Sequence, residues 1–412
     1  MIKLIKNARV FDGHSAQLLE GFDLVVEEGR IVDLGRHLKA NAEMHIDLGG
    51  RVLLPGLIDA HVHVYAAELN LTQNMRRPFS YVAHYGARLL KHMLDTGFTT
   101  VRDVGGGDAG LAHALKDGLL TGSRLVYGGR ILSQTGGHAD WRPGHEHDPS
   151  CMPCGCGLTD QRMSVIADGV DEVTKAVREE LRRGASHIKF VASGGVASPT
   201  DPLDSMQYSP QEIEAIVAET ARHGSYAAAH CIPNAAIKLC TELGVRSIEH
   251  ATLVDAPTAQ LMKKMGTFAV PTLAVVESLS LYGAELGLPK ASCAKLASVA
   301  ALTKGGLAIL RDAGVSVGFG TDLIGPLYTR NLTEFALRSE VFTPIEILRQ
   351  ATSINASLLQ RTGELGCIAP GARADLVAVD GDPLRDISVM TRGPAAMPLV
   401  MKDGEIVRNL LC

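Results

Sequence analysis

The sequence lacks a strong net charge, a basic run and a long apolar run, and each absence narrows the class of protein. Its 412 residues carry a formal net charge of −5 without a cluster of basic residues. Since nucleic-acid binding needs a basic surface, we expect no nucleic acid as a partner. No stretch approaches about 18 consecutive apolar residues, so we expect no membrane partner. Met1 to Lys6 lack the apolar core of a signal peptide, and we therefore expect a cytoplasmic protein.

The sequence also lacks a second cysteine pair at zinc-finger spacing. Most of the 8 cysteines are scattered, which is typical of reduced thiols rather than of a disulfide framework. The exception is the group Cys151, Cys154 and Cys156, which follows His145 and His147 closely. This Cys151–Cys156 loop could be a secondary metal site or could form a disulfide. We favour a glycine- and proline-rich surface insertion, because no second cysteine pair follows it.

Both ends of the chain read as short strands separated by turns, in an otherwise ordinary globular composition of 46% hydrophobic and 21% charged residues. The expected strands are 3–10, 23–27, 30–34 and 44–47 near the beginning, and 375–380 and 399–402 near the end. Long helical periodicity is missing from both segments. We therefore predict that residues 1–54 and 366–412 together form one small β-sandwich domain.

Residues 55–365 show repeated strand and helix patterns instead. The strand candidates are 57–64, 99–104, 124–133, 187–192, 225–230, 247–250, 267–273 and 316–320, and helix candidates such as 81–96, 171–183, 209–223 and 333–339 lie between them. This alternation predicts an α/β protein with a (β/α)8 TIM barrel over 55–365. A doubly wound open sheet is the alternative, but no G-x-G-x-x-G opens an early helix. The run Gly105 to Gly107 is read as a tight turn between a strand and a helix.

Polar side chains collect where the predicted strands end, and the active site of a TIM barrel lies at that edge. His61 and His63 are two residues apart in a strand, so both imidazoles can point to the same side. Neutral imidazole is the commonest protein ligand of zinc and similar metals. The full set is His61 and His63 on the first strand, Lys189 on the fourth, His230 on the fifth, His250 on the sixth and Asp322 after the eighth. Any one of them could be an ordinary core residue, but the six together predict a metal site.

Lys189 is the hardest of these residues to explain as a structural one. A lysine in a buried strand is costly to desolvate unless it is neutralised or paired. Burial would lower its pKa and leave a nucleophilic amine. Reaction with CO2 would turn that amine into a carbamate, whose two oxygens could bridge two cations. The alternative is a lysine that reaches the rim or pairs with a carboxylate.

The run Pro55 to His63, with the lysine, histidines and aspartate in the order given above, resembles the amidohydrolase superfamily. The resemblance covers nearly the whole chain, and the run Gly371 to Val377 resembles the return into the family's small β domain. It implies two divalent metal ions, most often zinc. Their implied ligands are His61, His63 and Asp322 for the more buried ion, His230 and His250 for the more exposed one, and a carboxylated Lys189 as the bridge.

The chemistry implied by this resemblance is hydrolysis. Two cations would lower the pKa of a water between them toward neutrality. Asp322 would accept the proton of the attacking water and could return it to the leaving nitrogen. A further donor should face the developing oxyanion, and His138, in the run Gln134 to His138, is our candidate. The alternative for His138 is an ordinary loop histidine.

The runs Ala192 to Val196 and Ser198 to Ser209 most resemble a prolidase-like group within the imidazolonepropionase-related dipeptidases. We therefore predict a metal-dependent Xaa-Pro dipeptidase that acts on small dipeptides, and we expect a homo-oligomer. Tyr328 and Arg330 are candidate partners of the substrate carboxylate, with surface exposure as their alternative. Such relatives tend to place a tyrosine where this sequence has Ile232. That departure keeps open an N-acyl amino acid, a xenobiotic amide of the ochratoxin type, or a cyclic amide as in imidazolonepropionase. A non-catalytic assembly module should lack ligands, and none is missing here.

Overall fold

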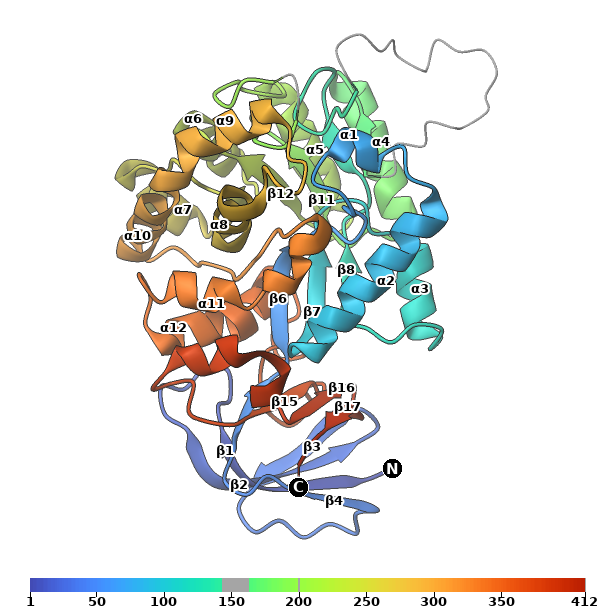
Figure 1. The fold of residues 1–412 in the computed structure, drawn as a ribbon, viewed down its shortest axis with the longest axis vertical. Coiled ribbons are helices and arrows are strands. Elements are labelled where there is room, and N and C mark those ends of the chain that lie inside the picture. The colour runs from blue at the N-terminus through green and yellow to red at the C-terminus, as the bar shows by residue number, and fades with distance from the viewer. Residues whose placement is uncertain (143–162, 199–200, 412) are drawn as a thin grey trace.

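The computed structural model describes residues 1–142, 163–198 and 201–411 (Figure 1). The predictions for the Cys151–Cys156 loop, with His145 and His147, lie outside these described residues. The molecule has a small sheet at one end and a larger body of strands and helices above it (Figure 1).

The small sheet is built from both ends of the chain. Its strands are β1 (Lys3–Val10), β2 (Leu19–Glu27), β3 (Arg30–Gly35), β4 (Met44–Asp47), β5 (Val52–Pro55), β15 (Leu376–Val379), β16 (Leu399–Lys402) and β17 (Glu405–Asn409). They form one eight-stranded sheet in the order β17-β16-β15-β5-β1-β2-β3, with β4 also paired to β1. β1 pairs in parallel with β4 and β5, and β5 pairs antiparallel with β15. The pairing of β5 with β15 therefore joins the two terminal segments.

Parallel strands form the centre of the larger body. They are β6 (Leu57–Val62), β7 (Phe98–Asp103), β8 (Arg124–Tyr127), β9 (Ile131–Ser133), β10 (Ser164–Ile166), β11 (Ile188–Val191), β12 (Ala227–Cys231), β13 (Ser247–His250) and β14 (Phe268–Val270). These strands make a three-stranded sheet, β6-β7-β8, and a six-stranded sheet, β10-β9-β11-β12-β13-β14. Parallel pairing brings the carboxyl ends of neighbouring strands to one edge, which is where the predicted site residues lie.

The two parallel sheets are linked by a few backbone hydrogen bonds rather than by one continuous ladder. The amide of Ser186 donates to the carbonyl of Tyr127 over 2.9 Å, beside the break between β8 and β9. On the other side, Val317 bridges Ala269, and Ala60 donates to the carbonyl of Phe319 over 2.8 Å. The predicted strand 316–320 thus lies between β14 and β6, but it contributes a single bridge. Within the described residues the predicted barrel strands thus form two parallel sheets and a connecting segment.

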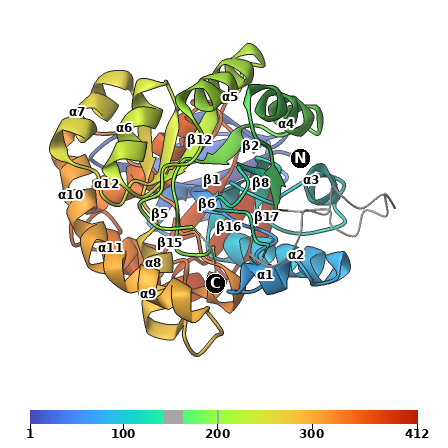
Figure 2. The same cartoon turned by 90° about the horizontal axis from the view of Figure 1, so that it is seen from above.

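Helices lie around the strands when the molecule is seen from above (Figure 2). They are α1 (Leu71–Asn74), α2 (Phe79–Asp95), α3 (Ala109–Lys116), α4 (Val170–Arg182), α5 (Pro210–Arg222), α6 (Asn234–Glu242), α7 (Ala256–Met265), α8 (Leu273–Tyr282), α9 (Lys290–Val299), α10 (Thr303–Ala313), α11 (Thr333–Arg338), α12 (Pro344–Arg349) and α13 (Asn355–Leu358). Short helical turns are η2 (Ala300–Leu302), η3 (Gly325–Arg330), η4 (Gln350–Ile354) and η5 (Ile387–Ala396). The start of α5 shows why sequence predicts such elements: Ser209 and Glu212 cap each other's backbone amides, and proline occupies the first turn.

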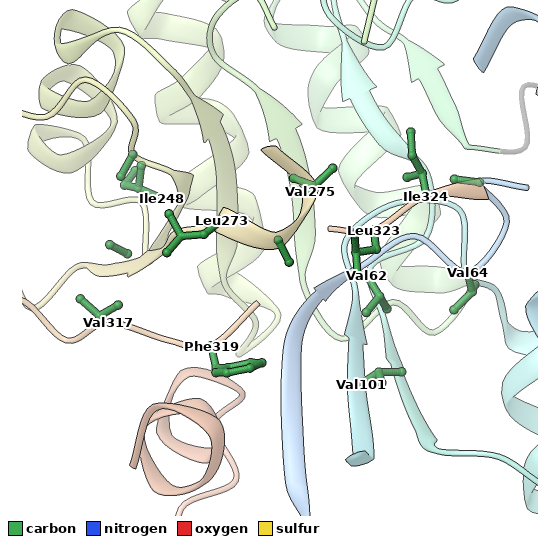
Figure 3. Close-up of a cluster of buried hydrophobic side chains, with 14 of the residues drawn as sticks. Val62, Val64, Val101, Ile248, Leu273, Val275, Val317, Phe319, Leu323 and Ile324 are labelled. Carbon is green, nitrogen blue, oxygen red and sulfur yellow. The ribbon is translucent and has the colours of Figure 1, made fainter. Parts of the chain in front are cut away.

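The main core lies between the parallel strands and the helices. Val62, Val101, Ile248, Phe319 and Leu323 belong to this cluster and are buried (Figure 3). The same cluster also takes in side chains of the small sheet, namely Val52, Leu54, Val377 and Val379. The small sheet and the larger body therefore share part of one hydrophobic core.

The segments α9, η2 and α10 follow one another without a break from Lys290 to Ala313. By length and hydropathy this is the one helix among the described residues that could cross a membrane. A single helix of this kind is weak evidence, because core helices of ordinary globular proteins have the same properties. Here Leu296 and Val299 on its first part line an internal cavity.

Candidate metal centre and active site

One cavity collects all six strand-end residues predicted from the sequence, together with His138. Its lining includes His61, His63, Lys189, His230, His250 and Asp322. The residues come from β6, β11, β12 and β13 and from the segment after Phe319, so five separate parts of the chain meet there. The register explains this meeting, because Val191 pairs with His230 and Cys231 pairs with His250 at the carboxyl ends of the strands.

Three of these side chains are close enough to bind one ion. The Nε2 atoms of His61 and His63 each lie 3.4 Å from Asp322 Oδ1, and His250 Nδ1 lies 4.0 Å from Asp322 Oδ2. One ligand atom from each of His61, His250 and Asp322 falls within 4.8 Å of the others. The ring centroids of His230 and His250 are 4.7 Å apart. The fifth-strand histidine thus lies beside the same cluster.

Each of the four strand-end histidines is oriented by a hydrogen bond at one of its two ring nitrogens. The pairs are His61 Nδ1 with Glu249 (2.7 Å), His63 Nδ1 with the Gly105 carbonyl (3.0 Å), His230 Nε2 with the Gly194 carbonyl (3.1 Å) and His250 Nδ1 with Thr272 Oγ1 (2.9 Å). Such contacts fix the ring orientation of histidines that bind metals. They leave the other nitrogen of each ring to act as a ligand.

The electrostatics of the cluster fit a metal ion. Burial lowers the pKa of His63 to about 4 and lowers the pKa values of His61, His230 and His250 well below the usual range. The rings are therefore neutral, which is the form that binds metals. His61 Nε2 is buried without a hydrogen-bond partner. A buried nitrogen lone pair without a partner is costly, and a bound cation would satisfy it.

Lys189 lines the cavity from β11. Its side chain is buried, and burial lowers the pKa of its ammonium group. The Glu249 and Asp322 carboxylates oppose this fall in the pKa of Lys189. The lysine in the strand Ile188–Val191 thus lies in an environment that disfavours its charged form.

The backbone is strained where two of the candidate ligands lie. His250 has φ of 69° and Asp322 has φ of 55°, values that non-glycine residues seldom adopt. The Asp59 carboxylate holds the neighbouring segments by accepting from the His61 amide (3.0 Å) and from the Thr321 hydroxyl (2.7 Å). Burial raises the pKa of Asp322 to about 7, and the Lys189 ammonium opposes that rise. A carboxylate tuned in this way suits proton transfer near neutral pH.

A buried ion pair lies behind His61, and it was not predicted from the sequence. Arg102 on β7 and Glu249 on β13 are both fully buried, and Arg102 Nη2 donates to Glu249 Oε1 over 2.7 Å. Ser247 Oγ donates to the same carboxylate over 2.5 Å. The available signal was a glutamate directly before His250 in a buried strand. Its partner on β7 is far away in sequence and had no comparable signal.

His138 follows β9 in a loop and faces the cluster. Its ring stacks on that of His230 with centroids 4.3 Å apart, and its Nδ1 lies 2.8 Å from Ser198 Oγ. No described residue is hydrogen-bonded to its Nε2. Ala139, the next residue, has φ of 94°, so the backbone is strained at this point too. His138 thus lines the same cavity as the strand-end residues, and its role as a donor to an oxyanion stays a prediction.

The walls of the cavity are mainly apolar. α8 contributes Val275, Val276 and Leu279, and α9 contributes Leu296 and Val299. Ile232 also lines the cavity. Trp141 lies on the wall beside His138, and its buried indole N–H has no hydrogen-bond partner. Apart from the histidines, Lys189 is the one basic side chain among the described lining residues.

Tyr328 and Arg330, the predicted carboxylate partners, are not among the lining residues. The Tyr328 ring packs edge-on against Tyr85 and His92. Arg330 donates to Ser278 Oγ over 2.9 Å and to Glu277 over 3.2 Å. The structure therefore does not bring this pair to the other site residues. Their contact with a substrate stays a prediction.

Comparison with known proteins gives a consistent result. The profile of the amidohydrolase family matches residues 52–407. Ochratoxinase of Aspergillus niger is 34% identical over 375 residues, covering 87% of this chain and 76% of the relative. Imidazolonepropionase of Nocardia farcinica is 26% identical over 386 residues, covering 87% and 84%.

Two solved structures extend this likeness to the whole chain. A prolidase complexed with N-methylphosphonate-L-proline has a TM-score of 0.95 and 42% identity, covering 99% of this chain and 100% of the other. A Xaa-Pro dipeptidase with bound methionine has a TM-score of 0.88 and 30% identity, again covering 99% and 100%. The folds of these neighbours imply a TIM barrel with a small additional domain.

Proposed function

Because this chain belongs to the amidohydrolase family, and is thus a metal-dependent enzyme that hydrolyses amide bonds, we propose that it cleaves Xaa-Pro dipeptides. The observation that carries the proposal is the position of the His and Asp cluster and His138 together in one apolar cavity. Similarity to a prolidase and to a Xaa-Pro dipeptidase over nearly the whole chain supports this choice of substrate.

We propose a binuclear zinc centre held on a (β/α)8 barrel. His61, His63 and Asp322 would hold one ion, and His230 and His250 would hold the other, with carboxylated Lys189 between them. The buried, unpartnered Nε2 of His61 and the neutral state of the four rings support these ligands. Bound zinc would supply a Lewis acid for the amide carbonyl and a water of lowered pKa.

Asp322 would then transfer the proton of the attacking water, and His138 would stabilise the negative charge that develops on the substrate oxygen. Asp322 accepts the proton of the attacking water on a carboxylate oxygen and returns it to the leaving nitrogen. His138 faces the developing oxyanion with Nε2, while Ser198 holds its Nδ1. The walls from α8 and α9 exclude water and accept an apolar acyl side chain.

A second candidate is hydrolysis of an N-acyl amino acid or an aromatic amide. It is favoured by the mainly apolar lining of the cavity, Ile232 included, which would accept a large apolar acyl group. Similarity to ochratoxinase supports it as well. A cyclic amide, as in imidazolonepropionase, is a third class of substrate.

The test is hydrolysis of a dipeptide library by zinc-loaded enzyme, with free amines detected by ninhydrin. Selective cleavage of Xaa-Pro members with apolar Xaa supports the proposal. The same enzyme is given a set of N-acyl amino acids and a set of cyclic amides in parallel. A silent dipeptide library with turnover of either other set would overturn the dipeptidase proposal in favour of that class.

We further propose a homo-oligomer located in the cytoplasm, with the small domain made of residues 1–54 and 366–412. Light scattering on the purified enzyme measures the assembly directly. A molar mass equal to one chain of 43.7 kDa would contradict the oligomer.

A further inference from the structure

A lysine on the helix that forms one cavity wall contacts the loop after β11, and this loop packs against His138. Lys295 lies on α9, and its Nζ donates to the carbonyls of Gly195 (3.1 Å) and Ser198 (3.0 Å). The same atom lies 3.5 Å from Asp201 Oδ1. Leu296, the next residue on α9, lines the cavity. One helix therefore carries both a wall of the cavity and a cation bound to the loop after β11.

Asp201 connects that loop to the His138 ring. Its side chain is 3% exposed, and it accepts from the Gly195 amide (3.0 Å) and from the Ser198 hydroxyl. Because that hydroxyl donates to Asp201, its oxygen is left to accept the proton on His138 Nδ1, 2.8 Å away. Asp201 Oδ2 itself lies 3.5 Å from the same nitrogen. Ser198 and Asp201 thereby hold the Nδ1–H of the ring. Donation from Nε2 to an oxyanion then requires the doubly protonated ring, whose charge the Asp201 carboxylate balances.

The His138 ring has little room to move. It stacks on His230, with centroids 4.3 Å apart. Gly195 also packs against the ring, so closely that a Cβ there would come within 2.4 Å of His138 Cε1. The position of the loop therefore fixes the position of the ring. Lys295 neutralises the buried Asp201 carboxylate and ties this loop to α9.

We propose that Asp201 and Lys295 are positioning residues for His138, and that Lys295 couples the apolar α9 wall to the oxyanion donor. This inference rests on the proposed function of His138. A substrate group that packs against Leu296 and Val299 presses on the same helix that holds the loop. Occupancy of the apolar wall thus affects how His138 is held, and with it the rate of the chemical step rather than substrate affinity.

The test compares kcat and KM for Lys295→Met, Lys295→Arg, Asp201→Asn and the double variant Asp201→Asn/Lys295→Met, on the best substrate found for the wild type. Lys290→Met is the matched control, because Lys290 is exposed at the start of the same helix. We expect Lys295→Met to lower kcat by about tenfold or more while KM changes by less than about twofold. Lys295→Arg should restore most of kcat, and the double variant should be no slower than Asp201→Asn alone.

Three results from the Lys295 and Asp201 variants would overturn the inference: an unchanged kcat in Lys295→Met, a loss confined to KM, or losses that multiply in the double variant. Multiplied losses would mean that the two residues act independently. An equal loss in Lys290→Met would also overturn it, since a general effect on α9 would then explain the data.

A second measurement separates this inference from the proposed function. Trp141 is the sole tryptophan of the chain, and its ring centroid lies 5.9 Å from that of His138. Its emission therefore reports the position of His138 in the resting enzyme without any turnover. We expect changed emission in Lys295→Met and Asp201→Asn and unchanged emission in Lys290→Met. If no amide is hydrolysed, the proposed function fails, and identical emission in all variants would then overturn the positioning role as well.

Discussion

At Asp322, backbone strain, burial and charge act on one carboxylate. Its φ is 55°, and burial raises its pKa to about 7. We expect Asp322→Asn to lower kcat by about 10²–10⁴-fold, because an amide cannot accept the proton of the attacking water. Metal content, measured by plasma mass spectrometry, should stay near that of the wild type, since the histidine ligands remain. Asp312→Asn, at an exposed aspartate, is the control, and near-normal kcat in Asp322→Asn would refute the mechanism.

Substitution of Lys189 tests whether a carboxylated lysine bridges the two proposed metal ions. Lys189→Ala removes the amine that CO2 would convert to a carbamate, so we expect the protein to lose most of its metal. Short carboxylic acids such as acetate or propionate should restore part of the metal content and of kcat, because they supply the missing oxygens in trans. Lys175→Ala on the exposed side of α4 is the matched control. Unchanged zinc content in Lys189→Ala would contradict the carbamate.

His187 gives a pH dependence that does not require a bound metal. It is fully buried against Tyr226, and burial lowers its pKa well below the usual value of about 6.5. Below about pH 6.5 His187 is protonated in the unfolded chain but stays neutral in the folded chain. Its burial therefore makes the folded state less stable as the pH falls. Between pH 7.5 and pH 5.5 the loss is about 1.4 kcal/mol.

The variant His187→Gln lacks this loss. We therefore compare the unfolding free energies of wild type and variant at two pH values. The amount by which the wild type exceeds the variant should be about 1.4 kcal/mol smaller at pH 5.5 than at pH 7.5. Urea unfolding of both proteins in the presence of a chelator measures the difference, and the other titrating groups cancel in the comparison. An equal gap at both pH values would mean that the imidazole is protonated in the folded state.

The sequence was informative about which strand-end residues meet in the cavity and less so about the residues that support them. His61, His63, Lys189, His230 and Asp322 could be identified because a polar residue at the end of a buried strand is unusual in itself. Arg102 and Glu249 also lie in buried strands, but their pairing across β7 and β13 depends on three-dimensional proximity. The same limit applies to Tyr328 and Arg330. Closeness in sequence to Asp322 suggested a shared cavity, whereas η3 turns them toward α2 and α8.

At the scale of elements, the loop after β11 controls how closely the backbone approaches His138. We expect Gly195→Ala to displace His138 and lower kcat by about tenfold or more, because its Cβ would lie 2.4 Å from the ring. Metal content should be unchanged. Gly305→Ala on α10 is the control, since a Cβ there meets nothing within 4 Å. Wild-type kcat in Gly195→Ala would show that the loop can yield without moving the ring.

Element boundaries were predicted best where local chemistry decides them. The strands Met44–Asp47 and Ser247–His250 match the prediction residue for residue, and α5 lies within the predicted 209–223 because Ser209 caps it. The predicted strand 124–133 instead divides around Gly128 and Gly129. A Cβ at Gly128 would collide with His187, so glycine there reflects close packing between distant segments. The segment 316–320 likewise depends on its neighbours for pairing, and only Val317 bridges β14.

At the scale of the whole molecule, the small sheet and the larger body are joined by ion pairs as well as by a shared hydrophobic core. Arg124 on β8 pairs with Asp375 and Asp403, each at 2.5 Å, and Asp375 is almost fully buried. Apolar contacts join the two parts as well, because Val52 and Val377 of the small sheet belong to the main core cluster. A disturbance of the metal centre should therefore reach the small sheet.

Metal removal tests this connection. An ion that binds the folded chain stabilises it by about 4 kcal/mol when its free concentration is about 1,000 times Kd, so chelation should lower the midpoint of urea unfolding and added zinc should restore it. Trp141 emission reports the cavity, and far-UV circular dichroism reports both sheets. Because the core is shared, we expect the two signals to move together with and without metal. A second transition, insensitive to metal and seen by circular dichroism alone, would mean that the small sheet unfolds independently of the site.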